Sequence, residues 1–100
     1  MSAETDALQD ALAAEHAATY LFALLGARTS EGREAELYTA LQAAYVEHRD
    51  RRDALIGQVA ALGAAPVAAA PAYTTPDGLD TTDQRQRLSL IHISEPTRPY

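Results

Sequence analysis

Residues 4–28, ETDALQDALAAEHAATYLFALLGAR, decide the fold of this chain. The stretch contains no Pro and is rich in residues that favour helices. A set of mostly apolar residues recurs at three- and four-residue intervals, which places them on one face of a helix. They are Leu8, Ala11, Leu12, Glu15, Ala18 and Phe22. Between residues 11 and 27 the other faces are mostly apolar too, so this helix should have neighbours on several sides.

A second helix is predicted over residues 31–62. The polar turn at residues 29–32 precedes it, and Ser30 is a suitable cap for its first turn. Gly63 is a typical signal for the end of a helix. Because so short a turn makes two long helices pack antiparallel, we predict an all-α fold with an antiparallel two-helix hairpin over residues 1–63.

Residues 64–87 are predicted to form a Pro/Ala-rich crossover. Three prolines between residues 66 and 76 exclude a regular helix there. Further along, Thr81, Thr82 and Asp83 are residue types that cap helices, so a third helix is expected to start near them.

The character of the sequence changes at Leu88. All 22 Ala residues lie within residues 1–72. Residues 88–98, LSLIHISEPTR, resemble the in-frame translation of a transposon-end adapter used in sequencing libraries. We therefore expect residues 88–100 to be an adapter-derived tail, with the natural sequence departing from this one near Arg87.

Length and composition exclude several classes of protein. One hundred residues make about one domain or less, and the absence of Cys excludes disulfides and thiolate metal sites. A net charge of −6 argues against a nucleic-acid partner. No apolar run reaches the roughly 18 residues that a membrane-spanning helix needs, and the acidic start shows no signal peptide. These features predict a cytoplasmic protein with no membrane span.

The hairpin is expected to bring polar residues together at its centre. With a turn centred near residue 30, position i of the first helix should face roughly position 60 − i of the second. Glu15 should then face Tyr45, with His48 one turn away. A buried carboxylate or imidazole is costly unless it is paired or metal-bound, so Glu15 and His48 are candidate metal ligands. The alternative is structural, with Glu15 paired to His48, Arg51 or Arg52.

Three tracts carry a resemblance to a known group of proteins. They are EHAATYLFALLGAR at residues 15–28, EHRDRRDAL at residues 47–55 and GAAPVAAAPAY at residues 63–73. With them, residues 4–75 resemble the ferritin-like superfamily and, more narrowly, a small bacterial ferritin-like family of unknown function. The resemblance implies the first two helices and the start of the long crossover of a four-helix bundle.

The resemblance also implies a metal site, but an incomplete one. Metal-binding members of the superfamily place one Glu on the first helix and a Glu-x-x-His motif on the second, repeated in the other half. Glu15 and His48 match two of these positions, whereas Tyr45 stands where the second Glu is expected. The second half, with its two ligand helices, is absent from this sequence.

Three functions remain open, in this order of preference. The first is a metal-free structural or interaction module, because Tyr45 replaces the expected Glu. The second is a di-metal carboxylate protein, binding iron or manganese or acting as an oxidoreductase, with Glu15 and His48 as ligands. The third is a self-associating hairpin, whose partner is a second copy or the missing helices of its own bundle. No catalytic residue is predicted, and the sequence favours a protein that is not an enzyme.

Overall fold

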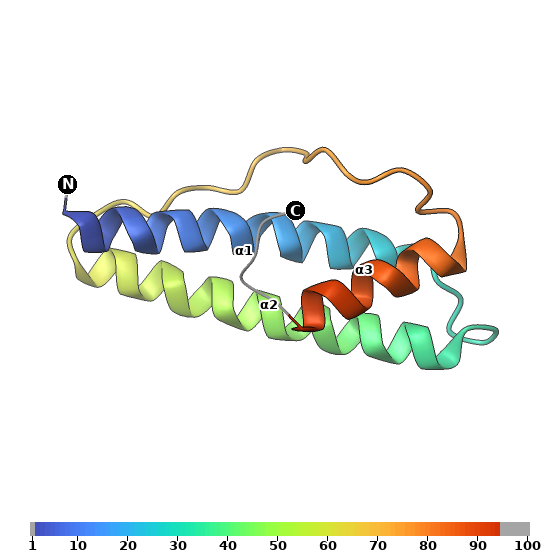
Figure 1. The fold of residues 1–100 in the computed structure, drawn as a ribbon. Coiled ribbons are helices and arrows are strands. Elements are labelled where there is room, and N and C mark those ends of the chain that lie inside the picture. The colour runs from blue at the N-terminus through green and yellow to red at the C-terminus, as the bar shows by residue number, and fades with distance from the viewer. Residues whose placement is uncertain (1, 95–100) are drawn as a thin grey trace.

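The computed structural model describes residues 2–94, with the side chains of residues 2–90. Its three helices are α1 (Ala3–Ala27), α2 (Ala35–Ala61) and α3 (Thr82–Ser94). α1 and α2 run antiparallel, and the shorter α3 lies beside the end of the hairpin that carries the turn (Figure 1). No strand occurs within residues 2–94, so the predicted all-α fold and antiparallel hairpin are confirmed. No helix in this range is long and apolar enough to cross a membrane.

The first helix begins and ends within one residue of its predicted bounds. Ser2 caps it, because the Ser2 hydroxyl accepts a hydrogen bond from the Thr5 backbone N–H at 3.1 Å. Glu4 and Asp6 lie in the first turn, where negative charge interacts favourably with the helix dipole. α1 is buried on several sides, as its sequence predicts.

The second helix begins at Ala35, four residues later than predicted. Ser30 does not cap α2, since its hydroxyl accepts from the Arg33 backbone N–H at 3.1 Å and so closes a separate turn. Glu34 has φ −129° and ψ 48°, outside the helical region, and this residue separates the turn from the helix. The prediction that the helix starts at residue 31 was therefore wrong.

The end of α2 follows the glycine signal in the sequence. Gly63 has φ +82°, a left-handed conformation that other residues adopt only at a cost. Its N–H bonds to the Ala60 carbonyl at 3.0 Å, and the Ala64 N–H bonds to the Val59 carbonyl at 3.3 Å. These two bonds form a Schellman motif, which satisfies carbonyls that the helix would otherwise leave unpaired.

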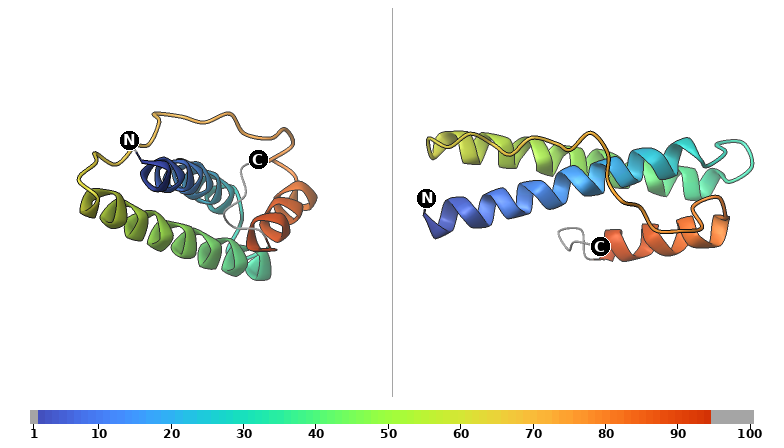
Figure 2. Two further views of the ribbon diagram at one scale, coloured as in Figure 1. Left: turned by 60° about the vertical axis from the view of Figure 1, so that its left-hand side comes forward. Right: turned by 90° about the horizontal axis from the view of Figure 1, so that it is seen from above.

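The crossover spans residues 62–81 in the structure and passes from the end of α2 across α1 to the start of α3 (Figure 2). Gln9 binds it twice, donating to the Ala65 carbonyl at 2.7 Å and accepting from the Val67 N–H at 2.8 Å. Because the crossover runs the length of the hairpin, α3 runs parallel to α2 (Figure 1). The Thr81 hydroxyl caps α3 by accepting from the Gln84 N–H at 3.3 Å.

The hydrophobic core is concentrated at the turn end of the hairpin, where α3 covers it. There the side chains of α1, α2, the crossover and α3 meet; they are Leu21, Phe22, Leu25, Leu37, Leu41, Ala44, Leu79 and Leu88. Towards the opposite end Val59 is completely buried, but Leu8 and Leu55 are only half-buried. The hairpin is thus well packed at one end and thinly packed at the other.

Glu34 joins α3 to the hairpin through a polar network. The Thr82 hydroxyl donates to Glu34 Oε2 at 2.5 Å, and Arg85 Nη2 donates to the same oxygen at 2.9 Å. Arg85 is buried and also donates to the Leu79 carbonyl at 2.9 Å. The Thr82 hydroxyl, the Ser30 N–H and the Arg85 guanidinium lower the pKa of Glu34 from 4.5 to about 2.

We predict that the contribution of Glu34 to the docking of α3 is lost only in strong acid. Because the pKa of Glu34 is lower in the folded state, its contribution is fully present above pH 4.5 and is lost as the pH falls through about 2. NMR spectra of the Arg85 amide and guanidinium should report that midpoint in the wild type and show no such transition in Glu34→Gln. Glu36→Gln is the matched control, and its spectra should follow the wild type. A midpoint near 4.5 in the wild type would contradict the role of Glu34.

Candidate functional site

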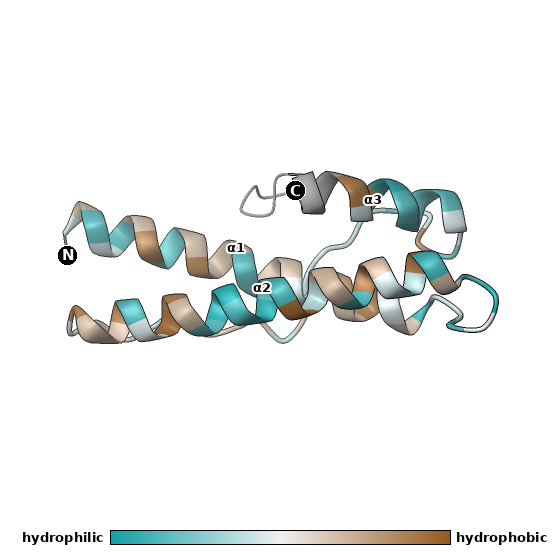
Figure 3. Cartoon of the chain, turned by 90° about the horizontal axis from the view of Figure 1, so that it is seen from below, coloured by the Kyte–Doolittle hydropathy of each residue, from teal (hydrophilic) through white to brown (hydrophobic). Residues whose placement is uncertain are grey.

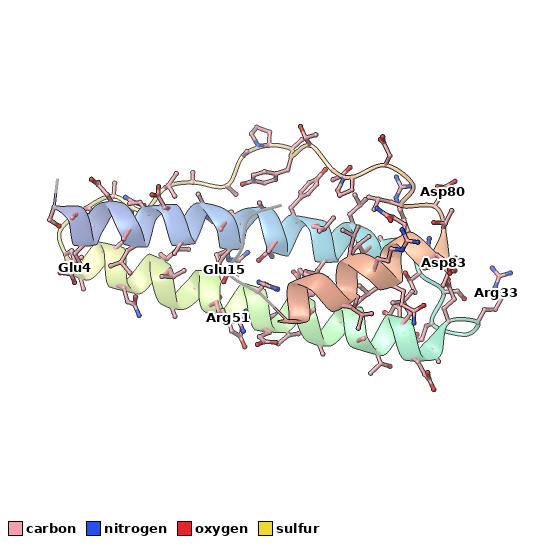
Figure 4. All side chains as sticks on the ribbon, viewed as in Figure 1. Glu4, Glu15, Arg33, Arg51, Asp80 and Asp83 are labelled. Atoms are coloured by element: carbon pink, nitrogen blue, oxygen red, sulfur yellow. The ribbon has the colours of Figure 1, made fainter. Side chains whose placement is uncertain are left out.

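Glu15 of α1 and His48 of α2 meet in the middle of the hairpin, and the position of Glu15 is labelled in Figure 4. His48 Nδ1–H donates a hydrogen bond to Glu15 Oε1 at 2.5 Å. Each side chain is only 1% exposed. The structure therefore brings the two predicted site residues into direct contact.

The register of the hairpin differs from the predicted one by about one helical turn. Glu15 was expected to face Tyr45, yet its contact is His48, three residues further along α2. The reason lies in the connection, which lasts until Ala35 and so moves the centre of the turn beyond residue 30. His48 was expected one turn from the approximate partner Tyr45, and the carboxylate lies directly against its imidazole.

The surroundings of the pair are apolar. The Phe22 ring stacks on the His48 ring, with centroids 5.2 Å apart and an interplanar angle of 12°. Leu12 and Leu41 are completely buried on the same two helices. Glu15 Oε2 is buried and has no hydrogen-bond partner among the described residues. An ionisable pair in such surroundings is desolvated, so each member depends on the other for stabilisation.

The arginines of α2 do not take part in this pair. Arg51 donates to Glu47, four residues earlier on the same helix, and Arg52 donates to Asp53. Figure 3 shows the middle of α2 as hydrophilic, in agreement with the partial exposure of these side chains. Of the predicted alternatives for Glu15, the structure shows pairing with His48 and not with Arg51 or Arg52.

His16, next to Glu15 in the sequence, serves a different purpose. Its Nε2–H donates to the Val67 carbonyl of the crossover at 2.9 Å, and the side chain is buried. Tyr20 packs against Tyr73 of the crossover with ring centroids 5.3 Å apart. The sequence gives no sign that Tyr73 lies here, because no periodic pattern indicates the path of an irregular crossover.

The donor geometry bears on whether the pair could hold a metal ion. A metal ion binds a His nitrogen and a carboxylate oxygen at about 2.0–2.2 Å each, which separates the two donors by roughly 3 Å. Here Nδ1 and Oε1 are 2.5 Å apart and bind each other. Within the part of the chain that the structure describes, no three His, Cys, Asp or Glu side chains gather as a metal site. As arranged, these residues do not fit around an ion, and metal ligation by Glu15 and His48 stays a prediction that requires them to separate.

Comparison with known proteins assigns the chain to a family without a known function. No curated protein and no solved structure matches it. A family model described as "Domain of unknown function (DUF4439)" matches residues 7–95, which is most of the chain and includes both Glu15 and His48. The chain therefore belongs to the DUF4439 family.

Proposed function

We propose that this protein is a metal-free helical module with a structural or interaction role. The observation that carries the proposal is the hydrogen bond between His48 and Glu15. This bond occupies His48 Nδ1 and Glu15 Oε1, two atoms that would otherwise be available to bind a metal ion. Tyr45, at the position of the expected second Glu, carries no carboxylate and is half-buried against Arg49, which lies 5.8 Å from its ring centroid.

The topology supports the further proposal that the hairpin is half of a ferritin-like bundle. In such bundles two antiparallel helices are followed by one long crossover, and the remaining helices complete the core. Here the crossover returns along the hairpin, and α3 runs parallel to α2 (Figure 1). The order of elements thus agrees with the resemblance that the sequence shows.

The interaction role rests on the thinly packed end of the hairpin. Leu8, Leu55 and Ile56 are half-buried there, and Leu62 is 46% exposed. Apolar surface of this kind is stabilised when a further helix or a second chain covers it. We place the contact with the missing helices of the bundle, or with a second copy, at this end.

Iron or manganese binding is the second candidate, and one observation favours it. Glu15 Oε2 is buried without a hydrogen-bond partner among the described residues, and a buried carboxylate oxygen in that state is costly. Binding an ion would require His48 to move away from Oε1. It would also require ligands from outside the described residues.

Metal analysis of the purified full chain tests these two candidates against each other. After dialysis against Fe²⁺ or Mn²⁺, the proposal predicts no stoichiometric metal and no rise in Tm, because only a ligand that binds the folded state stabilises it. Glu15→Gln and the exposed-site control Glu47→Gln should likewise bind no metal and show no rise in Tm when metal is added. Stoichiometric metal that is lost in Glu15→Gln but retained in Glu47→Gln would overturn the metal-free proposal.

The adapter origin of residues 88–98 is also a proposal, and sequencing the gene without that adapter tests it. The expected result is a reading frame that departs from LSLIHISEPTR near Arg87 and continues into two amphipathic helices. Finding this stretch encoded in the source DNA would contradict the proposal. It would also favour a genuine short hairpin protein over half of a four-helix bundle.

A further inference from the structure

A hollow of about 180 Å³ lies between α1, α2 and the crossover, apart from the Glu15–His48 pair. Three alanines line it, together with the larger side chains His16, Thr19, Tyr20, Tyr45, Arg52 and Tyr73. All of these residues precede Leu88, so the hollow does not depend on the origin of the C-terminal segment. An apolar floor with a few polar groups around it is the usual composition of a small-molecule site.

The wall that the crossover contributes is held in place by hydrogen bonds. Gln9 binds both Ala65 and Val67, and His16 donates to the Val67 carbonyl. Further along, the Tyr73 hydroxyl accepts from the Ala70 N–H at 2.8 Å. The hollow therefore exists before any ligand binds, which lowers the entropic cost of binding.

Size and lining indicate an aromatic ligand with a single ring. At about 180 Å³ the hollow suits a small ligand, because drug-sized ligands need roughly 300 Å³ or more. Three tyrosine rings line the hollow, and two of them, Tyr20 and Tyr73, are tilted by 58° to each other. Aromatic rings pack favourably in such tilted arrangements.

The charge around the hollow selects an anion. The chain as a whole carries a net charge of −6, yet the residues that line the hollow include Arg52 and no Asp or Glu. The present partner of Arg52 is Asp53, whose side chain is 59% exposed. Exposed ion pairs of this kind contribute little stability, so a ligand carboxylate can replace Asp53 at the guanidinium.

Thr19 contributes a second polar group to the hollow. Thr19 is 7% exposed and lines the hollow, and its hydroxyl has no hydrogen-bond partner among the described residues. A buried hydroxyl without a partner is costly, and a ligand oxygen would remove that cost. We infer that this hollow binds a small aromatic monocarboxylate, with its ring against the tyrosines and its carboxylate at Arg52.

An NMR titration of the full chain with sodium benzoate, in the presence of a chelator, tests the inference. The expected result is a set of amide shifts confined to the lining residues of α1, α2 and the crossover. For a ligand of this size we expect a Kd on the order of 1 mM. Benzyl alcohol should bind more weakly at the same site, and acetate should not shift these amides.

Two variants separate the local effect of the Arg52 charge on benzoate binding from the effect of the net charge of the chain. Arg52→Gln should weaken benzoate binding about tenfold, because it removes a charge-assisted contact, and should leave benzyl alcohol unaffected. Arg33→Gln changes the net charge equally but lies in the turn outside the hollow (Figure 4), and it should bind benzoate like the wild type.

Absence of benzoate shifts, equal shifts with acetate, or equal weakening in both variants would overturn the inference. Because neither Glu15 nor His48 lines the hollow, none of these results bears on the metal-free proposal.

Discussion

The hydrogen bond between His48 Nδ1 and Glu15 Oε1 is the contact on which the rest of the structure depends. Both groups are buried, and each would carry a large desolvation cost without the other. Sliding α1 against α2 by one turn would separate them and would also unpack the large core side chains at the turn end of the hairpin. The buried polar pair therefore sets the register of the hairpin together with this core, as buried polar residues do in coiled coils.

Alanine explains why this hairpin needs additional layers. Small side chains let α1 and α2 approach each other but bury little apolar area per residue. The larger core side chains gather at the turn end, where α3 covers them. Over the remainder of α1 the crossover is held mainly by side-chain hydrogen bonds from Gln9 and His16 to its backbone. The molecule therefore combines a small apolar core with hydrogen bonds that hold the crossover against α1.

Local signals in the sequence predicted the local structure well. The bounds of α1, the glycine-terminated end of α2 and the antiparallel pairing follow from periodicity, capping and turn length. The start of α2 did not follow, because Glu34 is recruited by Thr82 and Arg85, which lie about fifty residues further along the chain. That tertiary contact overrides a capping preference, and it also lengthens the turn enough to shift the predicted partner of Glu15.

The candidate site was predictable only in part. Glu15 and His48 stand out because a polar residue on an apolar face is unusual, whatever the register. Thr19, Arg52 and Tyr73 gave no such signal, since their proximity depends on the path of a crossover without periodicity. The path is set by contacts between residues more than fifty positions apart, which no local pattern encodes.

A double-mutant cycle on Glu15 and His48 tests most directly whether they stabilise each other. In urea unfolding followed by helical circular dichroism, Glu15→Leu and His48→Leu should each lose about 3–5 kcal/mol, because each leaves its partner buried and unpaired. The double variant should regain most of that loss, giving a coupling energy of about 2 kcal/mol or more. If a single variant is unfolded in buffer, recovery of the helical signal in the double variant gives the same answer. Additive losses, with the double variant the least stable, would contradict the account.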